Sequence, residues 1–349
     1  MKRFLLYGAN GYTGRLTAEL AVQRGMQPVL AGRSEARVRE VAEPLGLEHR
    51  AFSLDAPDEV DRGLAEIDAV LHMAGPFSRT SAPMVDACLR TRTHYLDITG
   101  EIDVFEAIFA RNDEAKRAGV ALVPGVGFDV VPTDCLAVLL QRALPTATHL
   151  ELAFLPRGGL SPGTTKTALD GLKKGGRERE SGVLREVPFL AHKRWASFPS
   201  GERLCVSIPW GDVSTAFHST GIPNVRVYMA MPPRRARWLR RATKLSPLAS
   251  VSVIERALEK WIDVAVQGPD ERARARGGSE VWGEAGDEEG RVVTGTLEAP
   301  EGYSLTADAS LKAVARVLDG VPAGALTPSL AFGADFVRSL EGVRVKISL

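Results

Sequence analysis

Short apolar runs alternate with stretches of helical periodicity along the first 130 residues of the chain. The runs are too short for buried helices, and the stretches between them repeat apolar residues at the spacing of an amphipathic helix. Strands that alternate with helices form a parallel sheet covered by helices on both faces. The pattern therefore predicts a doubly wound α/β fold, with strands at residues 4–7, 28–31, 50–54, 69–73, 94–97 and 120–123.

Three equally spaced glycines, Gly8, Gly11 and Gly14, follow the first apolar run, and a helical pattern follows them. This succession of strand, glycine turn and helix is the context of a dinucleotide-binding fingerprint. Gly8 permits a tight turn, Gly11 lets the backbone approach a pyrophosphate, and Gly14 lets the helix pack close to the strand. An ordinary turn is the alternative interpretation. We expect a Rossmann domain that binds phosphates at Gly8, Asn10, Gly11, Tyr12, Thr13 and Gly14.

The residues after the second run indicate which nucleotide would bind. In NAD-binding domains an acidic residue at this place binds the ribose 2′-hydroxyl. Here the position carries Arg33, with Ser34 beside it and Arg37 one turn later. A guanidinium binds a 2′-phosphate that a carboxylate would repel. The pattern favours NADP(H) over NAD(H), and a solvated arginine is the alternative.

Two further predicted strands end in candidate cofactor residues. Asp55 follows the third strand, where it would either hydrogen-bond the adenine amino group or cap a helix that begins near Pro57. Ligands of open α/β sheets bind outside the carboxyl ends of the strands. We therefore expect the turn after the fourth strand to pass under the ribose and nicotinamide, at Ala74, Gly75, Pro76 and Phe77.

The second half predicts an inserted domain. Strands are expected at 150–155 and 225–231, a hairpin at 281–284 and 292–297, and a helix at 307–318. That helix has an apolar stripe through Leu311, Val314, Ala315 and Leu318, which must be buried, and the first sheet is the nearest large apolar surface. We predict a Rossmann domain at 1–131, an inserted α+β domain for substrate binding or dimerisation at 132–300, and a return to the Rossmann domain at 301–349.

The length, net charge and cysteine content of the chain limit the classes of protein to which it can belong. A chain of 349 residues exceeds one average domain, and a net charge of +1 gives no general field for nucleic acid. The three cysteines are widely spaced, which fits a reducing compartment and indicates no metal site. No apolar run reaches membrane-spanning length. We expect a cytoplasmic protein, with peripheral membrane contact as an alternative.

Five segments then show a family resemblance. They read GANGYTG, AGR, AGPFSR, THYLDITGE and PGVGFDVVPTD, and a later TPSLAFG accompanies them. In this order and spacing they resemble the saccharopine dehydrogenase-like oxidoreductases, a group that includes saccharopine reductases and trans-acting enoyl reductases. The resemblance implies a Rossmann domain that binds NADPH and a second α/β domain that covers the cofactor.

Candidate catalytic residues lie at predicted strand ends. Tyr95 and Asp97 project to the same side of their strand, and Asp129 follows the sixth strand. Hydride transfer requires positioning and a proton donor, and each of these side chains could donate or relay a proton. The alternatives are that the two aspartates cap turns and that Tyr95 belongs to the core.

The leading functional hypothesis is an NADPH-dependent reductase of an enoyl (C=C) acyl substrate. Imine (C=N) reduction of an amino-acid adduct and a non-catalytic NADPH-binding module are the alternatives. A basic segment from Arg234 to Lys244 would contact an acyl carrier or an anionic membrane surface. A homodimer through the inserted domain is also expected.

Overall fold

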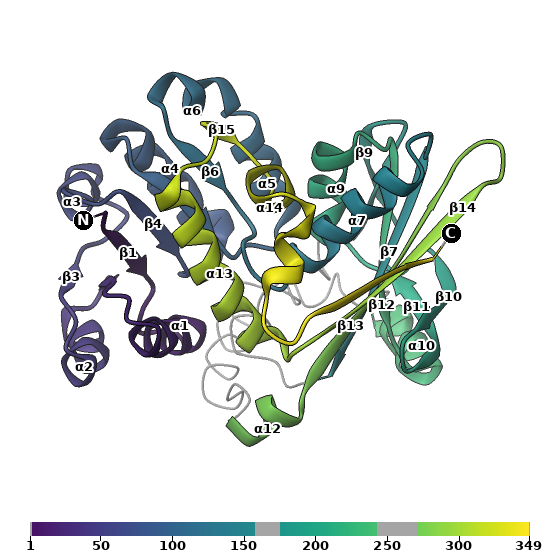
Figure 1. Cartoon of the computed structure of the whole chain (residues 1–349), viewed down its shortest axis with the longest axis horizontal. Coiled ribbons are helices and arrows are strands. Elements are labelled where there is room, and N and C mark those ends of the chain that lie inside the picture. Colours follow the sequence, from purple (N-terminus) through teal and green to yellow (C-terminus); the bar gives the residue numbers. More distant parts are fainter. Residues whose placement is uncertain (1, 158–174, 243–270, 349) are drawn as a thin grey trace. The chain divides into compact units, whose positions relative to one another are not determined.

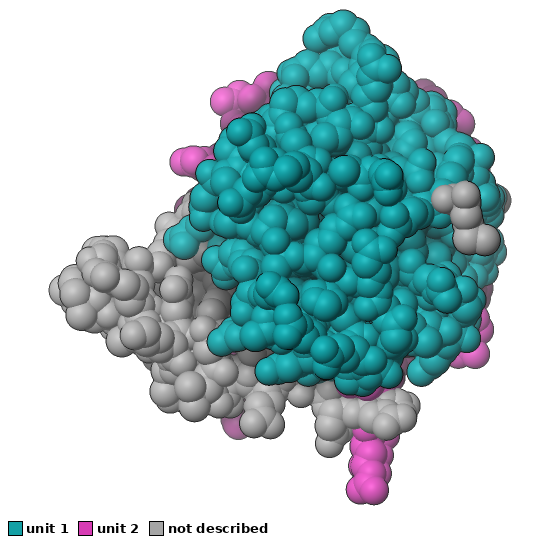
Figure 2. Space-filling view, turned by 90° about the vertical axis from the view of Figure 1, so that its left-hand side faces the viewer, with its two compact units in different colours: residues 1–135, 303–341 teal, residues 136–302, 342–349 magenta. Residues whose placement is uncertain are grey.

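The computed structural model describes residues 2–157, 175–242 and 271–348. The chain divides into two compact units, each of which takes residues from separate parts of the sequence. Unit 1 comprises Met1–Cys135 and Tyr303–Glu341, and unit 2 comprises Leu136–Gly302 and Gly342–Leu349. In the space-filling view the two segments of unit 1 form one continuous body (Figure 2).

Unit 1 is built on a seven-stranded parallel sheet. Its strand order is β3-β2-β1-β4-β5-β6-β15, so the chain starts at β1, moves to one edge, and returns to build the other half. This reversal between β1 and β4 is the switch point at which doubly wound sheets bind dinucleotides. The strands are β1 (Phe4–Tyr7), β2 (Val29–Gly32), β3 (His49–Ala51), β4 (Ala69–His72), β5 (His94–Asp97), β6 (Ala121–Val123) and β15 (Gly324–Ala325).

Helices cover both faces of this sheet (Figure 1). On one face, Tyr7 and Val70 pack in a single core with Met84 of α4 and Phe105 of α5. On the other face, α1 and α13 lie side by side (Figure 1). The helices of unit 1 are α1 (Tyr12–Gln23), α2 (Glu35–Leu45), α3 (Pro57–Gly63), α4 (Phe77–Thr91), α5 (Ile102–Phe109), α6 (Asn112–Ala118), α13 (Gly302–Asp319) and α14 (Pro328–Phe332), with a 3₁₀ turn η2 (Ala334–Ser339).

The late segment of unit 1 is held to the early one by buried groups. Arg24 of α1 forms an ion pair of 2.6 Å with Asp308 of α13, which is buried. Leu311 and Val314 are at most 1% exposed. Ala315, which was predicted to belong to the same apolar stripe, is exposed, because the buried face continues through Val317 instead.

Unit 2 contains a nine-stranded mixed sheet. Seven strands follow the order β10-β11-β12-β7-β13-β14-β16, and β8 pairs with both β12 and β9. Only β7 and β12 pair in parallel. The strands are β7 (His149–Arg157), β8 (Gly176–Glu180), β9 (Val183–Val187), β10 (Lys193–Phe198), β11 (Gly201–Ser207), β12 (Asn224–Ala230), β13 (Gly278–Gly286), β14 (Val292–Ala299) and β16 (Arg344–Ser348).

Helix α7 packs closely on this second sheet. A Cβ added to Gly283 would lie 2.8 Å from Leu140, and one added to Gly295 would lie 2.9 Å from Leu136. Because these strand positions are glycines, the leucine side chains of α7 can pack directly against the backbone of the sheet. The helices of this part are α7 (Val131–Ala143), α9 (Asp212–Thr220), α10 (Pro233–Ala242) and α12 (Glu271–Arg276).

The apolar pattern also predicts a single helix at 103–117, and the structure differs from the predicted elements in three places. The predicted helix at 103–117 is two helices, α5 and α6, and β8 to β11 were not predicted. The final strand β16 pairs with β14, so residues 342–349 belong to unit 2 and not to the Rossmann unit. The sequence pattern also predicts a glycine-rich loop at 158–165 and helices at 166–174 and 246–264, and all three lie outside the described residues. The domain boundaries at 131 and 300 stay a prediction.

Candidate active site at the carboxyl edge of the parallel sheet

The glycine turn fits tightly between the ends of three strands. Gly8 has φ +90° and donates a hydrogen bond of 2.8 Å to Ala31 O. A Cβ on Gly8 would come within 2.8 Å of Ala74 N, and a Cβ on Gly14 would come within 2.3 Å of Gly8 O. These two positions therefore require glycine for the turn itself to form.

Gly11 faces open space instead. It has φ −76°, is exposed, and an added Cβ would meet only Gly8 O, at 3.3 Å. Gly11 is also the N-cap of α1, and no side chain caps that helix. The first amides of α1 are therefore oriented toward a space where an anion can bind, as the fingerprint requires.

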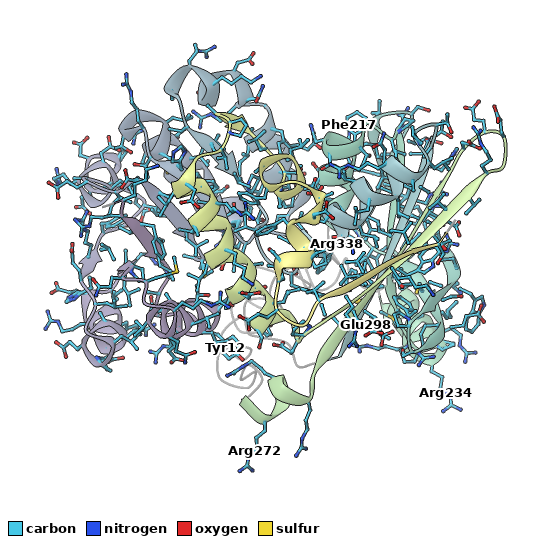
Figure 3. All side chains as sticks on the ribbon, viewed as in Figure 1. Tyr12, Phe217, Arg234, Arg272, Glu298 and Arg338 are labelled. Atoms are coloured by element: carbon cyan, nitrogen blue, oxygen red, sulfur yellow. The ribbon has the colours of Figure 1, made fainter. Side chains whose placement is uncertain are left out.

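The side chains of this turn surround the same space. Asn10 lies over the end of β2, because its Oδ1 would be 3.0 Å from a Cβ on Gly32. Tyr12, which is labelled in Figure 3, packs edge-on against Tyr303 of the returning segment, with ring centroids 4.9 Å apart. The backbone carbonyl of Thr13 accepts a hydrogen bond from Thr17. Tyr303 is a site residue that sequence reasoning missed, since no local pattern connects it with Tyr12.

Two arginines beyond β2 are available for a ligand. Arg33 and Arg37 are exposed and form no hydrogen bond or ion pair with any residue that the structure describes. By contrast, Arg39 of the same helix pairs with Glu35. Ser34 is the N-cap of α2, but its hydroxyl makes no capping bond. Free guanidinium groups beside an uncapped helix start suit the 2′-phosphate of NADP(H).

Asp55 does not cap the following helix. The N-cap of α3 is Ala56, with no side-chain cap, and Asp55 accepts a hydrogen bond of 2.9 Å from the Ser53 hydroxyl. The capping alternative is wrong, because the helix begins one residue too late for the Asp55 carboxylate to reach its amides. Its contact with the adenine stays a prediction.

Two side chains, those of Thr80 and Glu101, fix the turn from Ala74 to Phe77 by hydrogen bonds to its backbone. Thr80 donates a hydrogen bond of 2.7 Å to Ala74 O, and the amide of Phe77 donates one of 2.8 Å to Glu101. The Ser78 amide also bonds the Glu101 carboxylate, at 3.2 Å. Glu101 thus caps α4 and fixes the predicted nicotinamide turn. Sequence reasoning assigned it no role, although its place after a strand end was visible.

Tyr95 and Asp97 form a buried pair. Both are 0% exposed, and the Tyr95 hydroxyl donates a hydrogen bond of 2.7 Å to Asp97. The Asp97 carboxylate also accepts from the amides of Thr99, at 3.0 Å, and Gly125, at 2.8 Å. Burial raises the pKa of Asp97 to about 6 and the pKa of Tyr95 well above its usual value. The pair therefore connects β5 to the turn after β6, which carries Asp129.

Asp129 stands at the end of that turn. It is half-buried, and its carboxylate would be 2.9 Å from a Cβ on Gly100, so it lies over the turn after β5. Burial raises the pKa of Asp129 to about 7. The preceding amide, that of Phe128, donates a hydrogen bond of 3.0 Å to Thr306 of α13. Thr306 thus supports the Asp129 turn, and it is another residue that sequence reasoning missed.

The described residues contain neither a metal-binding cluster nor a membrane-spanning helix. No group of three or more His, Cys, Asp or Glu side chains within residues 2–157, 175–242 and 271–348 could hold a metal ion. Cys88, Cys135 and Cys205 are free and buried. Among the helices that the structure describes, none combines the length and apolar character needed to cross a membrane.

Comparisons with known proteins agree on the first unit. The model of the saccharopine dehydrogenase NADP-binding domain family matches residues 4–123. A trans-acting enoyl reductase of Mycobacterium leprae is 37% identical over 151 residues, which are 40% of this chain and 35% of that protein. A putative trans-acting enoyl reductase of Mycobacterium tuberculosis is 32% identical over 205 residues, 53% of this chain and 48% of that protein. The chain thus spans about half or less of the curated relatives it matches.

A solved structure extends the likeness to the whole fold. The apo saccharopine dehydrogenase (L-Glu forming) of Saccharomyces cerevisiae superposes with a TM-score of 0.67 over 100% of both chains, at 13% identity. At that identity the likeness shows the fold alone. The predicted fold class, a Rossmann sheet with a second sheet domain, is confirmed. The resemblance to the saccharopine dehydrogenase-like oxidoreductases is likewise confirmed, since residues 4–123 of this chain match the model of the saccharopine dehydrogenase NADP-binding domain family.

Proposed function

We propose that this chain is an NADPH-dependent reductase of the C=C bond of an enoyl acyl substrate that is presented on a carrier. The main support for this proposal is that two relatives, 37% and 32% identical to this chain over the matched regions, bear the name enoyl reductase. The structural likeness to a saccharopine dehydrogenase supports the fold of this chain. At 13% identity it gives no support to the alternative of imine reduction. When bound, NADPH supplies the hydride of such a reduction.

The residues of unit 1 fit the nucleotide. The tight turn at Gly8 and Gly14 presents the start of α1 to the pyrophosphate, and the open side of Gly11 leaves room for it. Arg33 and Arg37, which have no partner among the described residues, would bind the 2′-phosphate. The nicotinamide would lie on the turn that Glu101 fixes.

Asp129 is the proposed proton donor. Reduction of a C=C bond adds a hydride to one carbon and a proton to the other, so a protonated acid beside the nicotinamide turn is needed. With a pKa of about 7, the Asp129 carboxyl keeps its proton in a large fraction of molecules at neutral pH. Tyr95 and Asp97 are inaccessible to substrate and would act as positioning residues, through the Gly125 amide.

Unit 2 offers no free arginine inside its sheet for an amino-acid carboxylate, as far as the described residues go. Arg194 forms ion pairs with Glu151 and, at 3.3 Å, with Glu284. Arg226 pairs with Glu178 at 2.7 Å. Each of these guanidinium groups is already neutralised, which favours an acyl substrate over an amino-acid adduct.

The basic helix α10 is the proposed contact for an acidic carrier. Arg234, Arg235 and Arg237 are exposed, and Arg234 points away from the body of unit 2 (Figure 3). The side chains after Arg237 and the end of the segment at Lys244 lie outside the described residues. Membrane contact through the same helix and a homodimer stay predictions.

NADPH oxidation measured by absorbance tests the proposal. Purified protein should oxidise NADPH with enoyl thioesters on a carrier protein, and it should not do so with an amino acid mixed with a carbonyl compound. Oxidation only with the imine-forming mixture would establish the imine alternative. Tight NADPH binding without turnover of either substrate would indicate a non-catalytic module.

A further inference from the structure

A cavity lies at the opposite edge of the parallel sheet from the candidate active site. Its volume is about 390 Å³, within the range of small-molecule sites. It is formed where β1, β4 and β5 begin and where α13 ends, so all of it belongs to unit 1. The polar and charged residues that line it include Lys2, Glu66, Asp68, Arg92 and His94.

Two residues of this lining have an unusual backbone. Glu66 has φ +61° and Arg92 has φ +59°, and they are two of only four non-glycine residues with positive φ among those described. L-residues adopt this left-handed conformation at a cost that glycine avoids. At the ends of three other helices the chain uses glycine for the same conformation, at Gly46, Gly119 and Gly221.

Arg92 ends α4 in the position that glycine takes elsewhere. Its backbone amide and that of Thr93 both bond Cys88 O, so the helix end is closed without help from the arginine side chain. The guanidinium is exposed and has no partner among the described residues. The fold itself gains nothing from a charged residue at this strained position, which points to a ligand as its reason.

Some of the polar groups that line the cavity already have protein partners. Asp68 accepts a hydrogen bond of 2.6 Å from the amide of Arg3, whose guanidinium lies 3.6 Å from Glu66. Leu318 O accepts from Lys2. Among the described residues, the Arg92 guanidinium and the His94 Nε2 have no bonded partner, and the Lys2 ammonium keeps N–H groups beyond the one bonded to Leu318.

His94 supplies one of these donors. Its Nδ1 accepts a hydrogen bond of 3.0 Å from the amide of Ala121. The neutral ring must then carry its proton on Nε2. No bond to Nε2 is found within the described residues. Burial and then the positive charge of Lys2 lower the pKa of His94, and the negative charge of Asp68 acts in the opposite direction.

From this arrangement we infer that the cavity binds a small oxyanion, the phosphate or carboxylate of a metabolite, between Arg92, the Nε2–H of His94 and Lys2. Two cations and a neutral donor line this cavity, where Asp68 accepts from the backbone amide of Arg3 and the Arg3 guanidinium lies 3.6 Å from Glu66. Charge-assisted bonds of this kind are the strong ones in proteins. The site is separate from the nucleotide site and does not rest on the proposed function.

Calorimetric titration of the whole chain with inorganic phosphate, and separately with acetate, tests this site. The nucleotide site is filled beforehand with saturating NADP⁺, so that Arg33 and Arg37 do not contribute. Saturable binding of at least one anion is expected, and the stronger of the two identifies the ligand class. Absence of saturable binding of both anions would overturn the inference.

Two matched variants decide whether Arg92 is responsible. Arg92→Gly and Glu66→Gly both place glycine at a left-handed position, so neither should lower the melting temperature. Arg92→Gly should weaken anion binding at least about tenfold, because a charge-assisted partner is lost. Glu66→Gly should bind as tightly as the wild type or more tightly. Unchanged binding by Arg92→Gly, or an equal loss in both variants, would refute the site.

Discussion

Replacement of Asp97 separates a positioning role from a catalytic one. This buried carboxylate accepts three hydrogen bonds, from the Tyr95 hydroxyl and from the amides of Thr99 and Gly125. Asp97→Ala leaves all three donors unpaired in the interior. Each unpaired buried donor costs about 1–3 kcal/mol, so the free energy of unfolding should fall by at least about 3 kcal/mol. That is a large part of the roughly 5–15 kcal/mol that stabilises a typical domain.

Asp97→Asn is the matched control. The amide oxygen can accept from Thr99 and Gly125, and the amide nitrogen can donate to the Tyr95 hydroxyl, which then reverses its direction. The free energy of unfolding should therefore fall by about 1–3 kcal/mol at neutral pH, less than for Asp97→Ala, since only the proton of the reversed Tyr95 hydroxyl loses its acceptor. NADPH binding and turnover should also be retained, because the Asp129 turn keeps its support.

The pH dependence of stability gives an independent check. Burial raises the pKa of Asp97 to about 6 from an ordinary value of 3.8, so the folded state holds its proton more tightly than the unfolded state. The wild type should consequently lose stability relative to Asp97→Asn as the pH rises from about 4 to about 6, by up to about 3 kcal/mol.

Urea unfolding at several pH values, followed by circular dichroism, measures these differences. A loss below about 1 kcal/mol for Asp97→Ala would show that the three donors find other partners, which contradicts the structural role. A stable Asp97→Asn variant that binds NADPH but cannot oxidise it would show that Asp97 takes part in the chemistry.

Three further predictions concern the candidate active site. NADPH should bind at least about tenfold more tightly than NADH, since a charge-assisted bond contributes about 1.5–3 kcal/mol, and Arg33→Ala should remove most of this difference in a fluorescence titration. Gly11→Val should abolish NADPH binding without changing the circular dichroism spectrum, because its Cβ points into open space; normal binding would disprove the fingerprint interpretation, and Gly14→Val, which clashes with Gly8, should unfold the turn. If Asp129 donates the proton, kcat/KM should fall as the pH rises above about 7, and a profile that Asp129→Asn leaves unchanged would assign the proton to another group.

The sequence alone determined those features of this protein that depend on consecutive residues. The apolar run before Gly8 predicted β1 with the bounds that the structure shows, because a short buried strand needs only its own apolar residues. The requirement for glycine at Gly8 and Gly14 also follows from a short local turn. Arg33 and Arg37 could be assigned to a phosphate because they follow directly after such a strand.

Tertiary structure decided what depends on residues far apart in the chain. Nothing near Asp97 in the sequence reveals that its carboxylate bonds the amide of Gly125, and nothing near Thr306 reveals its bond to Phe128. The strand β16 joins the second sheet because its partner β14 offers a free edge there, which no local pattern encodes. Hydrogen-bond partners and cavities arise only when distant segments pack, since packing sets which polar groups are bonded and which stay available for a ligand.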